Sequence, residues 1–136
     1  GLQKILMLGN LNAKRDWGYA PEFCEGMWRI LQQKNPDDFV LATGKAHSVR
    51  EFVELAFNEL GIKIFWKGKG VNEVGLNQKT GETIIRINPK YYRPAEVDFL
   101  LGDASKAHKE LSWKPKTSLN KLIKLMIKSD WDTLKH

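Results

Sequence analysis

The sequence is poor in the features that mark disulfide-linked, membrane-spanning and metal-binding proteins. Its 136 residues include a single cysteine, Cys24, which excludes an internal disulfide framework. No apolar run approaches the ~20 residues that a membrane helix needs, and no signal peptide is evident. The three histidines (His47, His108 and His136) are far apart in the sequence. We therefore expect no metal site, no membrane partner and a cytoplasmic protein.

The chain also lacks a concentrated basic segment, although its net charge is +6. Such a charge could serve a nucleic acid, a membrane surface or a small phosphorylated ligand. The lysines are spread along the chain with no basic run of five, which favours a solvated basic surface. Gly68-Lys69-Gly70 lacks the Lys-Ser/Thr ending and the following helix of a phosphate loop. We predict a surface loop over residues 68–81.

What the chain does contain is an alternation of strand and helix patterns. With 42% hydrophobic residues it has enough apolar surface for one ordinary domain. We expect strands in four apolar runs: residues 5–8, 39–43, 62–66 and 83–88. The run over residues 39–43 is apolar without alternation and is closed by Gly44. Such a run is typical of a strand covered on both faces in a parallel sheet.

Four helices are expected, two between these strands and two after the last one. Pro21 suits a first turn, and the stripe after it (Phe23, Met27, Ile30 and Leu31) has helical spacing. We interpret Met27 and Trp28 as packing residues. Ser48 and Glu51 have capping-box spacing, and Gly61 is placed to end that helix. Asp103 predicts a helix start. Ser118 begins a last helix with an apolar face (Leu119, Leu122, Ile123, Met126 and Ile127).

The stretch Tyr91–Asp103 is the best candidate for a binding site. Pro94 fixes its own φ and biases Arg93 towards an extended backbone. A guanidinium held in this way offers parallel donors to the oxygens of a diphosphate. The carboxylate of Glu96, three residues on, could accept hydrogen bonds from a pair of sugar hydroxyls. An ion pair at a helix start remains the alternative from these letters alone.

Several segments taken in order resemble the C-terminal part of the GDP-mannose 4,6-dehydratase family. These segments are AKRDWGYA, FVLATG, HSVREFVE, YYRPAEVDFLLGD and LSWKP, and they span nearly the whole chain. The family belongs to the extended short-chain dehydrogenase/reductase superfamily. By this resemblance Arg93 contacts the nucleotide diphosphate, Glu96 the ribose hydroxyls and Arg15 the nucleotide. Tyr19 and the residues at 22–25 depart from the family pattern, while the Arg-Asp-Trp-Gly core is intact.

The resemblance also implies an α/β fold class, with residues 1–136 forming one substrate-binding, C-terminal portion. Residues 39–44 would be the returning strand of the nucleotide-binding Rossmann sheet, whose main domain is missing from the chain. The chain begins without Met, and we interpret it as a fragment or as one half of a split gene. In the family, catalysis uses NADP, bound by a glycine-rich turn after the first strand. It also uses a Tyr followed four residues later by Lys.

Neither catalytic pattern occurs in this sequence. The residues four positions after the three tyrosines are Phe23, Ala95 and Glu96, and no G-x-G-x-x-G is found. We therefore expect no catalytic, cofactor-binding or metal-binding residue in this chain, and no dehydratase activity from it alone. Cys24 has no His or acid at a useful spacing for a catalytic thiol.

Two functions from different classes are compatible with the residues. The first is the GDP-mannose-binding portion of a dehydratase that makes GDP-4-keto-6-deoxymannose for deoxyhexose synthesis. The alternative is a small basic binding module for nucleic acid or another anion. An uncovered strand at 39–43 would be a template for association. We expect it to pair with a second copy of the chain, to lie under the chain's own helices, or to dock onto an N-terminal half.

Overall fold

The structure is a computed structural model that describes residues 3–95 and 100–134. The chain divides into two compact units. We name them the sheet unit (Gly1–Ala13 with Ser48–Asp98) and the helical unit (Lys14–His47 with Phe99–His136). Among the helices of the described ranges, none has the length and apolar character needed to cross a membrane.

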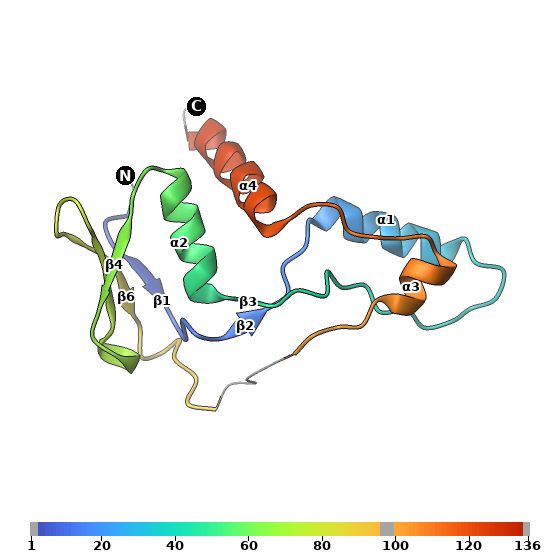
Figure 1. The fold of residues 1–136 in the computed structure, drawn as a ribbon, viewed down its shortest axis with the longest axis horizontal. Coiled ribbons are helices and arrows are strands. Elements are labelled where there is room, and N and C mark those ends of the chain that lie inside the picture. The colour runs from blue at the N-terminus through green and yellow to red at the C-terminus, as the bar shows by residue number, and fades with distance from the viewer. Residues whose placement is uncertain (1–2, 96–99, 135–136) are drawn as a thin grey trace. The chain divides into compact units, whose positions relative to one another are not determined.

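The sheet unit is built on four strands in the order β1-β6-β5-β4 (Figure 1). The strands are β1 (Leu6–Leu8), β4 (Ile64–Lys67), β5 (Val74–Asn77) and β6 (Thr83–Ile87). β1 runs parallel to β6 with Leu6 opposite Ile85, while β5 is antiparallel to both β4 and β6. A 3-10 turn, η1 (Gly70–Asn72), precedes β5. The mixed α/β class predicted from the sequence is confirmed.

Strand β5 corrects the prediction of a surface loop over residues 68–81. Only Val74 and Leu76 are apolar in this short strand, so the sequence signal for a strand is weak. Gly75 is buried, and a Cβ there would lie 3.1 Å from side-chain atoms of both Ile85 and Trp66. The missing side chain lets β5 lie between its two neighbours. Glycine here reflects close packing instead of a loop.

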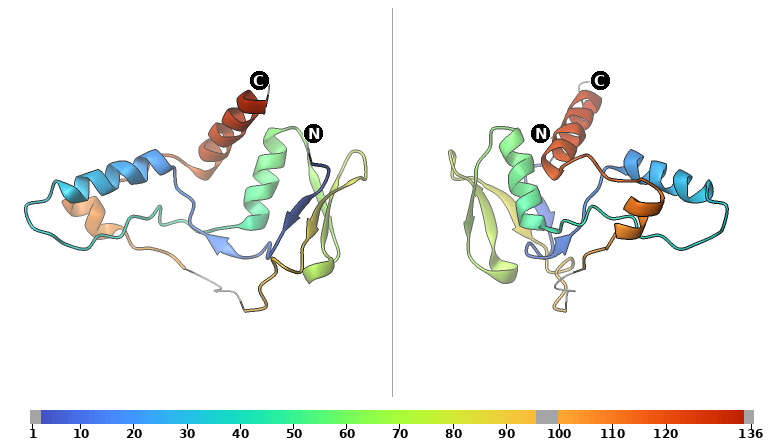
Figure 2. Two further views of the ribbon diagram at one scale, coloured as in Figure 1. Left: turned by 180° about the vertical axis from the view of Figure 1, so that it is seen from behind. Right: turned by 45° about the vertical axis from the view of Figure 1, so that its right-hand side comes forward.

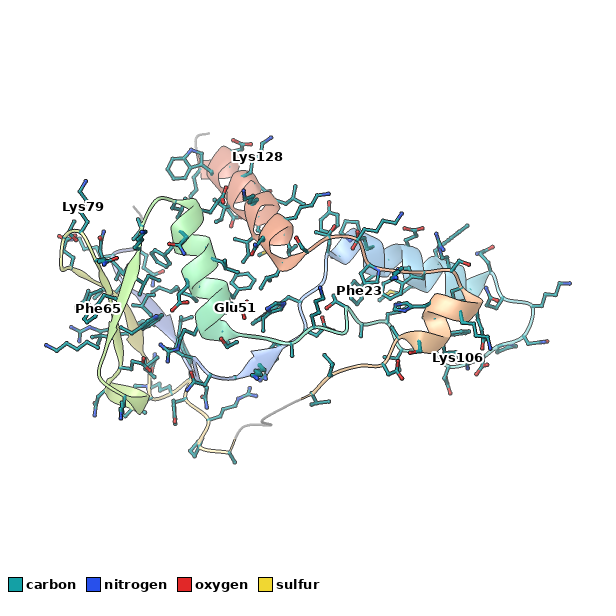
Figure 3. All side chains as sticks on the ribbon, in the orientation of Figure 1. Phe23, Glu51, Phe65, Lys79, Lys106 and Lys128 are labelled. Carbon is teal, nitrogen blue, oxygen red and sulfur yellow. The ribbon has the colours of Figure 1, made fainter. Side chains whose placement is uncertain are left out.

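The two edges of this sheet expose apolar side chains. Leu6 and Met7 on β1 are 37% and 38% exposed, so this strand is less buried than its sequence predicts. On the opposite edge, Phe65 of β4 is 56% exposed (Figure 3). The interior of the sheet lies on β6, where Ile85 is fully buried.

Helix α2 (Val49–Glu59) lies beside the sheet in both views of Figure 2. Ser48 caps it as predicted, since its hydroxyl accepts a hydrogen bond from the Glu51 amide at 3.1 Å. Gly61 follows the helix with a φ of 74°, a conformation that costs glycine little. The indole N–H of Trp66 donates to the Glu54 carboxylate at 2.6 Å and ties the helix to β4.

The helical unit contains α1 (Ala20–Leu31), α3 (Ser105–Glu110) and α4 (Leu119–Leu134). Two short strands, β2 (Lys14–Arg15) and β3 (His47–Ser48), pair with each other. The core is a cluster of five buried residues: Ala42, Ala104, Ala107, Leu111 and Trp113. The first turns of α4 are also buried at Leu119, Leu122 and Ile123, whereas Met126 is 46% exposed. The apolar face predicted for this last helix is therefore buried only at its start.

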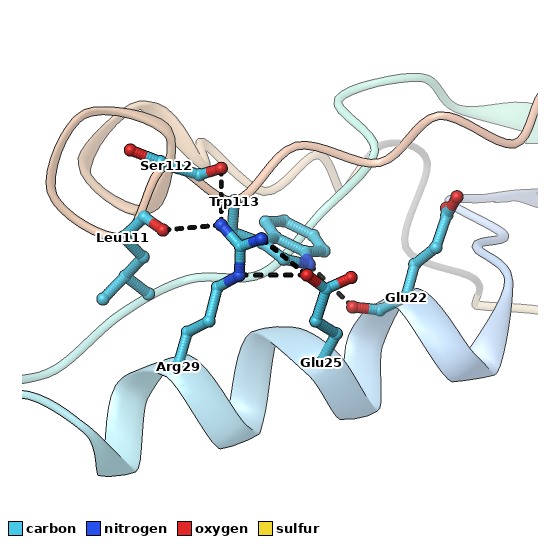
Figure 4. Close-up of polar contacts among 6 residues, drawn as sticks. All are labelled: Glu22, Glu25, Arg29, Leu111, Ser112 and Trp113. Carbon is cyan, nitrogen blue, oxygen red and sulfur yellow. Dashed lines mark hydrogen bonds and ion pairs between the residues drawn. The ribbon is translucent and has the colours of Figure 1, made fainter.

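Trp113 and Arg29 join α1 to the segment that follows α3 (Figure 4). Trp113 is 2% exposed, packs edge-on to Phe23 at 5.4 Å and donates its indole N–H to the Glu22 carbonyl at 2.6 Å. Arg29 donates to the carbonyls of Leu111 and Ser112 at 2.9 and 2.7 Å. Because these carbonyls lie at the end of α3, the guanidinium supplies partners that the helix itself cannot.

The apolar stripe predicted on α1 is only half correct. Phe23 and Ile30 pack against the core cluster. Met27, Trp28 and Leu31 are 57%, 61% and 79% exposed, so the prediction that Met27 and Trp28 pack within this chain is wrong. The packed face of α1 instead includes Gly26, which is buried and lies close to the side chains of Leu41 and Trp113.

Residues 39–43 form no strand in the structure. Ala42 is buried, Phe39 and Leu41 pack against the core cluster, and Val40 is 51% exposed. Within the described ranges no backbone-to-backbone hydrogen bond involves residues 39–42. Most of these side chains are thus covered by the helical unit's own residues, while the backbone of residues 39–42 has no backbone partner in the described ranges. That residues 39–44 return to a larger sheet, and that residues 1–136 form one substrate-binding portion, stay predictions.

Candidate functional site

A hollow of about 430 Å³ lies in the sheet unit where β1 and β6 end. Its walls come from the loop after β1, from the turn before β5 and from the segment after β6 (residues 9–13, Gly70, Glu73, Ile87, Tyr92, Pro94 and Ala95). In open α/β sheets, ligands bind outside the carboxyl ends of parallel strands, and β1 and β6 are such a pair. The volume is within the range of small-molecule sites.

The segments that leave β1 and β6 are joined residue by residue. The Asn88 amide donates to the Leu8 carbonyl at 2.8 Å, which extends the parallel pairing by one step. A Cβ on Gly9 would collide with the backbone of Tyr91, so only glycine allows this approach without a shift. Beyond it, Asn10 bonds the backbone of Arg93, 83 residues away in the sequence. Arg93 is therefore held at the end of the parallel pair.

Arg93 is an exposed residue of the segment that borders this hollow, although Arg93 itself is not one of the lining residues. Its neighbours Tyr92, Pro94 and Ala95 all line the wall. No hydrogen bond or ion pair of the Arg93 side chain is found within residues 3–95 and 100–134. A cation without a local partner, next to a small-molecule-sized hollow, can accept an anionic ligand. Glu96, predicted as the second contact, lies outside the described residues.

A partly buried ion pair stiffens the wall of the hollow at Asn12 and Glu73. Arg50 donates two bonds to the Glu73 carboxylate, at 2.8 and 3.0 Å, and a longer one of 3.3 Å to the Asn12 side chain. The guanidinium also stacks over Trp66 at 4.6 Å. Side chains of Arg50 and Glu73 are 24% and 14% exposed, so solvent screens the pair only in part. This network fixes the positions of Asn12 and Glu73 at the edge of the hollow.

Arg15, the third predicted contact, is on β2 in the helical unit. Its guanidinium donates to the Lys14 carbonyl at 2.7 Å. The next residue, Asp16, accepts bonds from the amides of Thr43 and Gly44 at 2.9 and 3.1 Å, and one from the Thr43 hydroxyl. The loop that carries Arg15 is therefore anchored to the end of residues 39–43. That Arg15 and Arg93 face one ligand stays a prediction.

Among the described residues, the loop after β1 leads to a second strand. The loop after β1 passes from Gly9 through Ala13 to β2, whereas a dinucleotide diphosphate needs a strand, a glycine turn and a helix. The described part of the chain also holds no group of three His, Cys, Asp or Glu residues fit for a metal ion. The chemistry that the site offers is recognition of an anionic small molecule.

Sequence reasoning missed Asn10, Arg50 and Glu73. Gly9-Asn10 was interpretable only as a turn, because nothing local reveals a partner 83 residues away. Arg50 and Glu73 are likewise 23 residues apart. A Glu in a glycine-rich stretch and an Arg in a helix are both common surface features.

The sequence matches the model of a protein family described as GDP-mannose 4,6 dehydratase over residues 1–126. Among curated relatives, the GDP-mannose 4,6 dehydratase of Drosophila melanogaster is 55% identical over 94% of this chain and 32% of its own length. The Dictyostelium discoideum enzyme of that name is 52% identical over 100% and 38%. The human one is 48% identical over 99% and 36%. The chain thus spans about a third of the length of these relatives.

Solved structures share the fold at low sequence identity. The structure titled RMD from Pseudomonas aeruginosa complexed with NADPH has a TM-score of 0.69 at 19% identity, over 96% of this chain and 36% of that one. UDP-glucose 4-epimerase from Thermotoga maritima, with UDP-glucose, has a TM-score of 0.70 at 21% identity over the same shares. These likenesses in fold confirm the predicted α/β fold class. With its family model matched over 126 residues, the chain belongs to the GDP-mannose 4,6-dehydratase family.

Proposed function

We propose that this chain is the sugar-nucleotide-binding portion of a GDP-mannose 4,6-dehydratase. The observation that carries the proposal is the position of Arg93, an exposed residue tied to the carboxyl ends of β1 and β6, whose neighbouring residues line a hollow of about 430 Å³. Its ligand would be the diphosphate of GDP-mannose, since a guanidinium matches phosphate oxygens in geometry and charge. Arg15 and Glu96 are the further contacts that we propose, to the nucleotide and to the ribose hydroxyls.

The whole protein would be an NADP-dependent lyase that converts GDP-mannose to GDP-4-keto-6-deoxymannose. Support for a nicotinamide cofactor comes from the family and from a structural neighbour whose title names NADPH. NADP would supply hydride transfer. The loop after β1 does not fit a dinucleotide, so we assign the cofactor to residues outside this chain. Cytoplasmic residence is part of the same proposal.

The proposed partner of this chain is an N-terminal half, with a second copy of the chain as the alternative. Two features support a partner. On α1, Met27, Trp28 and Leu31 are all more than half exposed. The backbone of residues 39–42 has no backbone partner among the described residues. Exposed apolar side chains and unpaired backbone groups both favour association. The alternative function, a basic module for nucleic acid, is not favoured by any of the relatives or neighbours reported above.

Removing the guanidinium tests the binding proposal. Arg93→Ala loses charge-assisted hydrogen bonds worth about 1.5–3 kcal/mol. We therefore expect the Kd for GDP-mannose to rise about tenfold or more, measured by calorimetry. Arg86→Ala is the matched control, because Arg86 is also exposed and in the same unit but lies within β6, outside the segment that follows this strand. Equal affinity in wild type and Arg93→Ala would remove Arg93 from the site. Affinity for RNA with a steep salt dependence would favour the alternative function.

The chain alone is expected to have no dehydratase activity with GDP-mannose and NADP. The physical reason is the missing proton-transfer pair and dinucleotide turn. The measurement is formation of the 4-keto sugar against a blank without protein. Product above the blank would show that catalytic groups exist in this chain after all.

A further inference from the structure

We propose that Asn10 is a positioning residue for the nucleotide diphosphate, acting through Arg93; the role rests on the function proposed above. The Asn10 side-chain amide donates from Nδ2 to the Arg93 carbonyl at 2.7 Å. The Arg93 amide in turn donates to Asn10 Oδ1 at 2.7 Å. Both polar groups of one side chain are thus committed to the backbone of one residue. We call this pair of bonds the Asn10 clip.

The Asn10 clip acts as a strand pairing made by a side chain. Bonding the N–H and the C=O of one residue resembles the reciprocal pair of an antiparallel ladder. It restrains the two peptide groups beside the Arg93 Cα, and hence the direction in which its side chain leaves the backbone. The assignment of oxygen and nitrogen in the amide follows from the partners, because a flipped amide would place donor against donor and acceptor against acceptor.

The place of the clip shows why Arg93 needs it. The amides of Tyr91 and Tyr92 both donate to the Asn88 carbonyl, so the segment after β6 is ordered up to that point. Pro94, the next residue after Arg93, has no N–H to give. Arg93 belongs to no helix or strand. Among the described residues of this segment, which end at Ala95, the clip provides the last hydrogen bonds.

The clip holds the backbone of Arg93 and leaves its side chain available to a ligand. The Arg93 backbone is fully bonded, while its guanidinium is exposed. A ligand can therefore recruit the side chain without breaking the tie. Pre-organising a cationic group in this way lowers the ordering cost of binding. The effect should appear only in the part of the affinity that depends on phosphate, because Arg93 is the group being placed.

The test is a double-mutant cycle on GDP affinity in the full chain. We expect Asn10→Ala to weaken GDP binding about three- to tenfold and to leave guanosine binding unchanged. In an Arg93→Ala background the same change should have no further effect. Asn10→Asp keeps the acceptor for the Arg93 amide and loses the donor, so its loss should be intermediate. Asn58→Ala, at an exposed asparagine of α2 in the same unit, is the matched control.

The outcomes distinguish failure of the positioning role of Asn10 from failure of the proposed sugar-nucleotide binding. Wild-type chain that binds no GDP overturns the proposed function and the positioning role with it. Wild-type affinity in Asn10→Ala, or additive losses in the cycle, overturns the positioning role alone. Equal loss of GDP and guanosine shows a general structural role instead. Without ligand, the Arg93 amide should exchange slowly in wild type and faster in Asn10→Ala and Asn10→Asp, and rapid exchange in wild type contradicts the clip itself.

Discussion

Two apolar stretches of this chain resemble each other in sequence and are held in different ways. Residues 6–8 form β1, whose backbone pairs with β6 although Leu6 and Met7 are more than one-third exposed. Residues 39–43 bury Ala42 and pack Phe39 and Leu41 against the core cluster, yet their backbone has no ladder partner within the described ranges. One stretch is held by backbone and the other by side chains. An apolar run therefore predicts burial or pairing, and neighbouring segments decide which.

Removing Trp113 should give the largest effect, since it takes away the packing on which residues 39–43 depend. Trp113→Ala leaves a large cavity in a core where the indole is 2% exposed. We expect a loss of about 3–5 kcal/mol in the free energy of unfolding, measured with denaturant. Trp28→Ala is the matched control in the same unit, because Trp28 is 61% exposed.

The two tryptophan variants should differ in where amide exchange rises as well as in how much stability is lost. In Trp113→Ala, amide exchange should rise in the helical unit while β6 in the sheet unit stays protected. If Trp28→Ala cost as much as Trp113→Ala, the core cluster would not be what holds residues 39–43.

Asp16 provides the second test, because its carboxylate anchors the end of residues 39–43. Asp16→Ala removes the bonds from the amides of Thr43 and Gly44 and should cost about 1–3 kcal/mol. In wild type, those two amides should exchange slowly and the amides of residues 40–42 rapidly. In the variant all of them should exchange rapidly. Asp130→Ala, at an exposed position of α4, is the control. Slow exchange of residues 40–42 in the monomeric wild type would contradict the unpaired backbone.

The smallest effect on stability is expected from the exposed ion pair between Lys106 and Asp37, just before residues 39–43. Lys106 on α3 contacts Asp37 at 2.6 Å, donates to the Asp38 carbonyl at 3.0 Å and lies 4.7 Å from the Phe39 ring centre. The hydrogen bond from Lys106 lowers the pKa of Asp37 from its ordinary 3.8, and the bond to Asp37 raises the pKa of Lys106 above 10.5. Because the pair is at the surface, its contribution should be slight.

The sign of the pH dependence follows from these directions. The Asp37 contribution is present above pH 3.8 and is lost as pH falls through the lowered pKa. The Lys106 contribution is present below pH 10.5 and is lost as pH rises through the raised pKa. Lys106→Gln should therefore flatten the acid and alkaline limbs of unfolding stability slightly, while Lys109→Gln on the same helix should not. Identical profiles for wild type and Lys106→Gln would mean that the ion pair contributes nothing measurable.

Local signals in the sequence predicted the elements that depend on local physics. Ser48 and Gly61 bound α2 as expected, and the apolar run after Thr83 gave β6. What failed depended on distant partners. Gly75 marks a packed strand because Trp66 and Ile85 approach it, and no pattern near Gly75 records that.

In the candidate site, too, residues with a local sequence signal were predicted and residues with distant partners were missed. Arg93 stood out because Pro94 and the resemblance both pointed to it. Asn10 did not, because its significance is a contact with a residue 83 positions away. Arg15 and Arg93 were both named from the sequence, and a shared ligand between their two units remains to be measured.

The distance in sequence between Asn10 and Arg93 has a consequence for how the chain folds. The closing contact spans 83 residues, and the pairing of β1 with β6 beside it is almost as long in range. Closing such a loop costs entropy that no neighbouring contact has yet repaid, so parallel pairing of this kind forms late and slowly. Until it forms, β1 has no partner strand and Arg93 has no fixed direction. Competence to bind a nucleotide should therefore appear with the last kinetic phase of refolding, after the hairpin of β4, β5 and β6 has already formed.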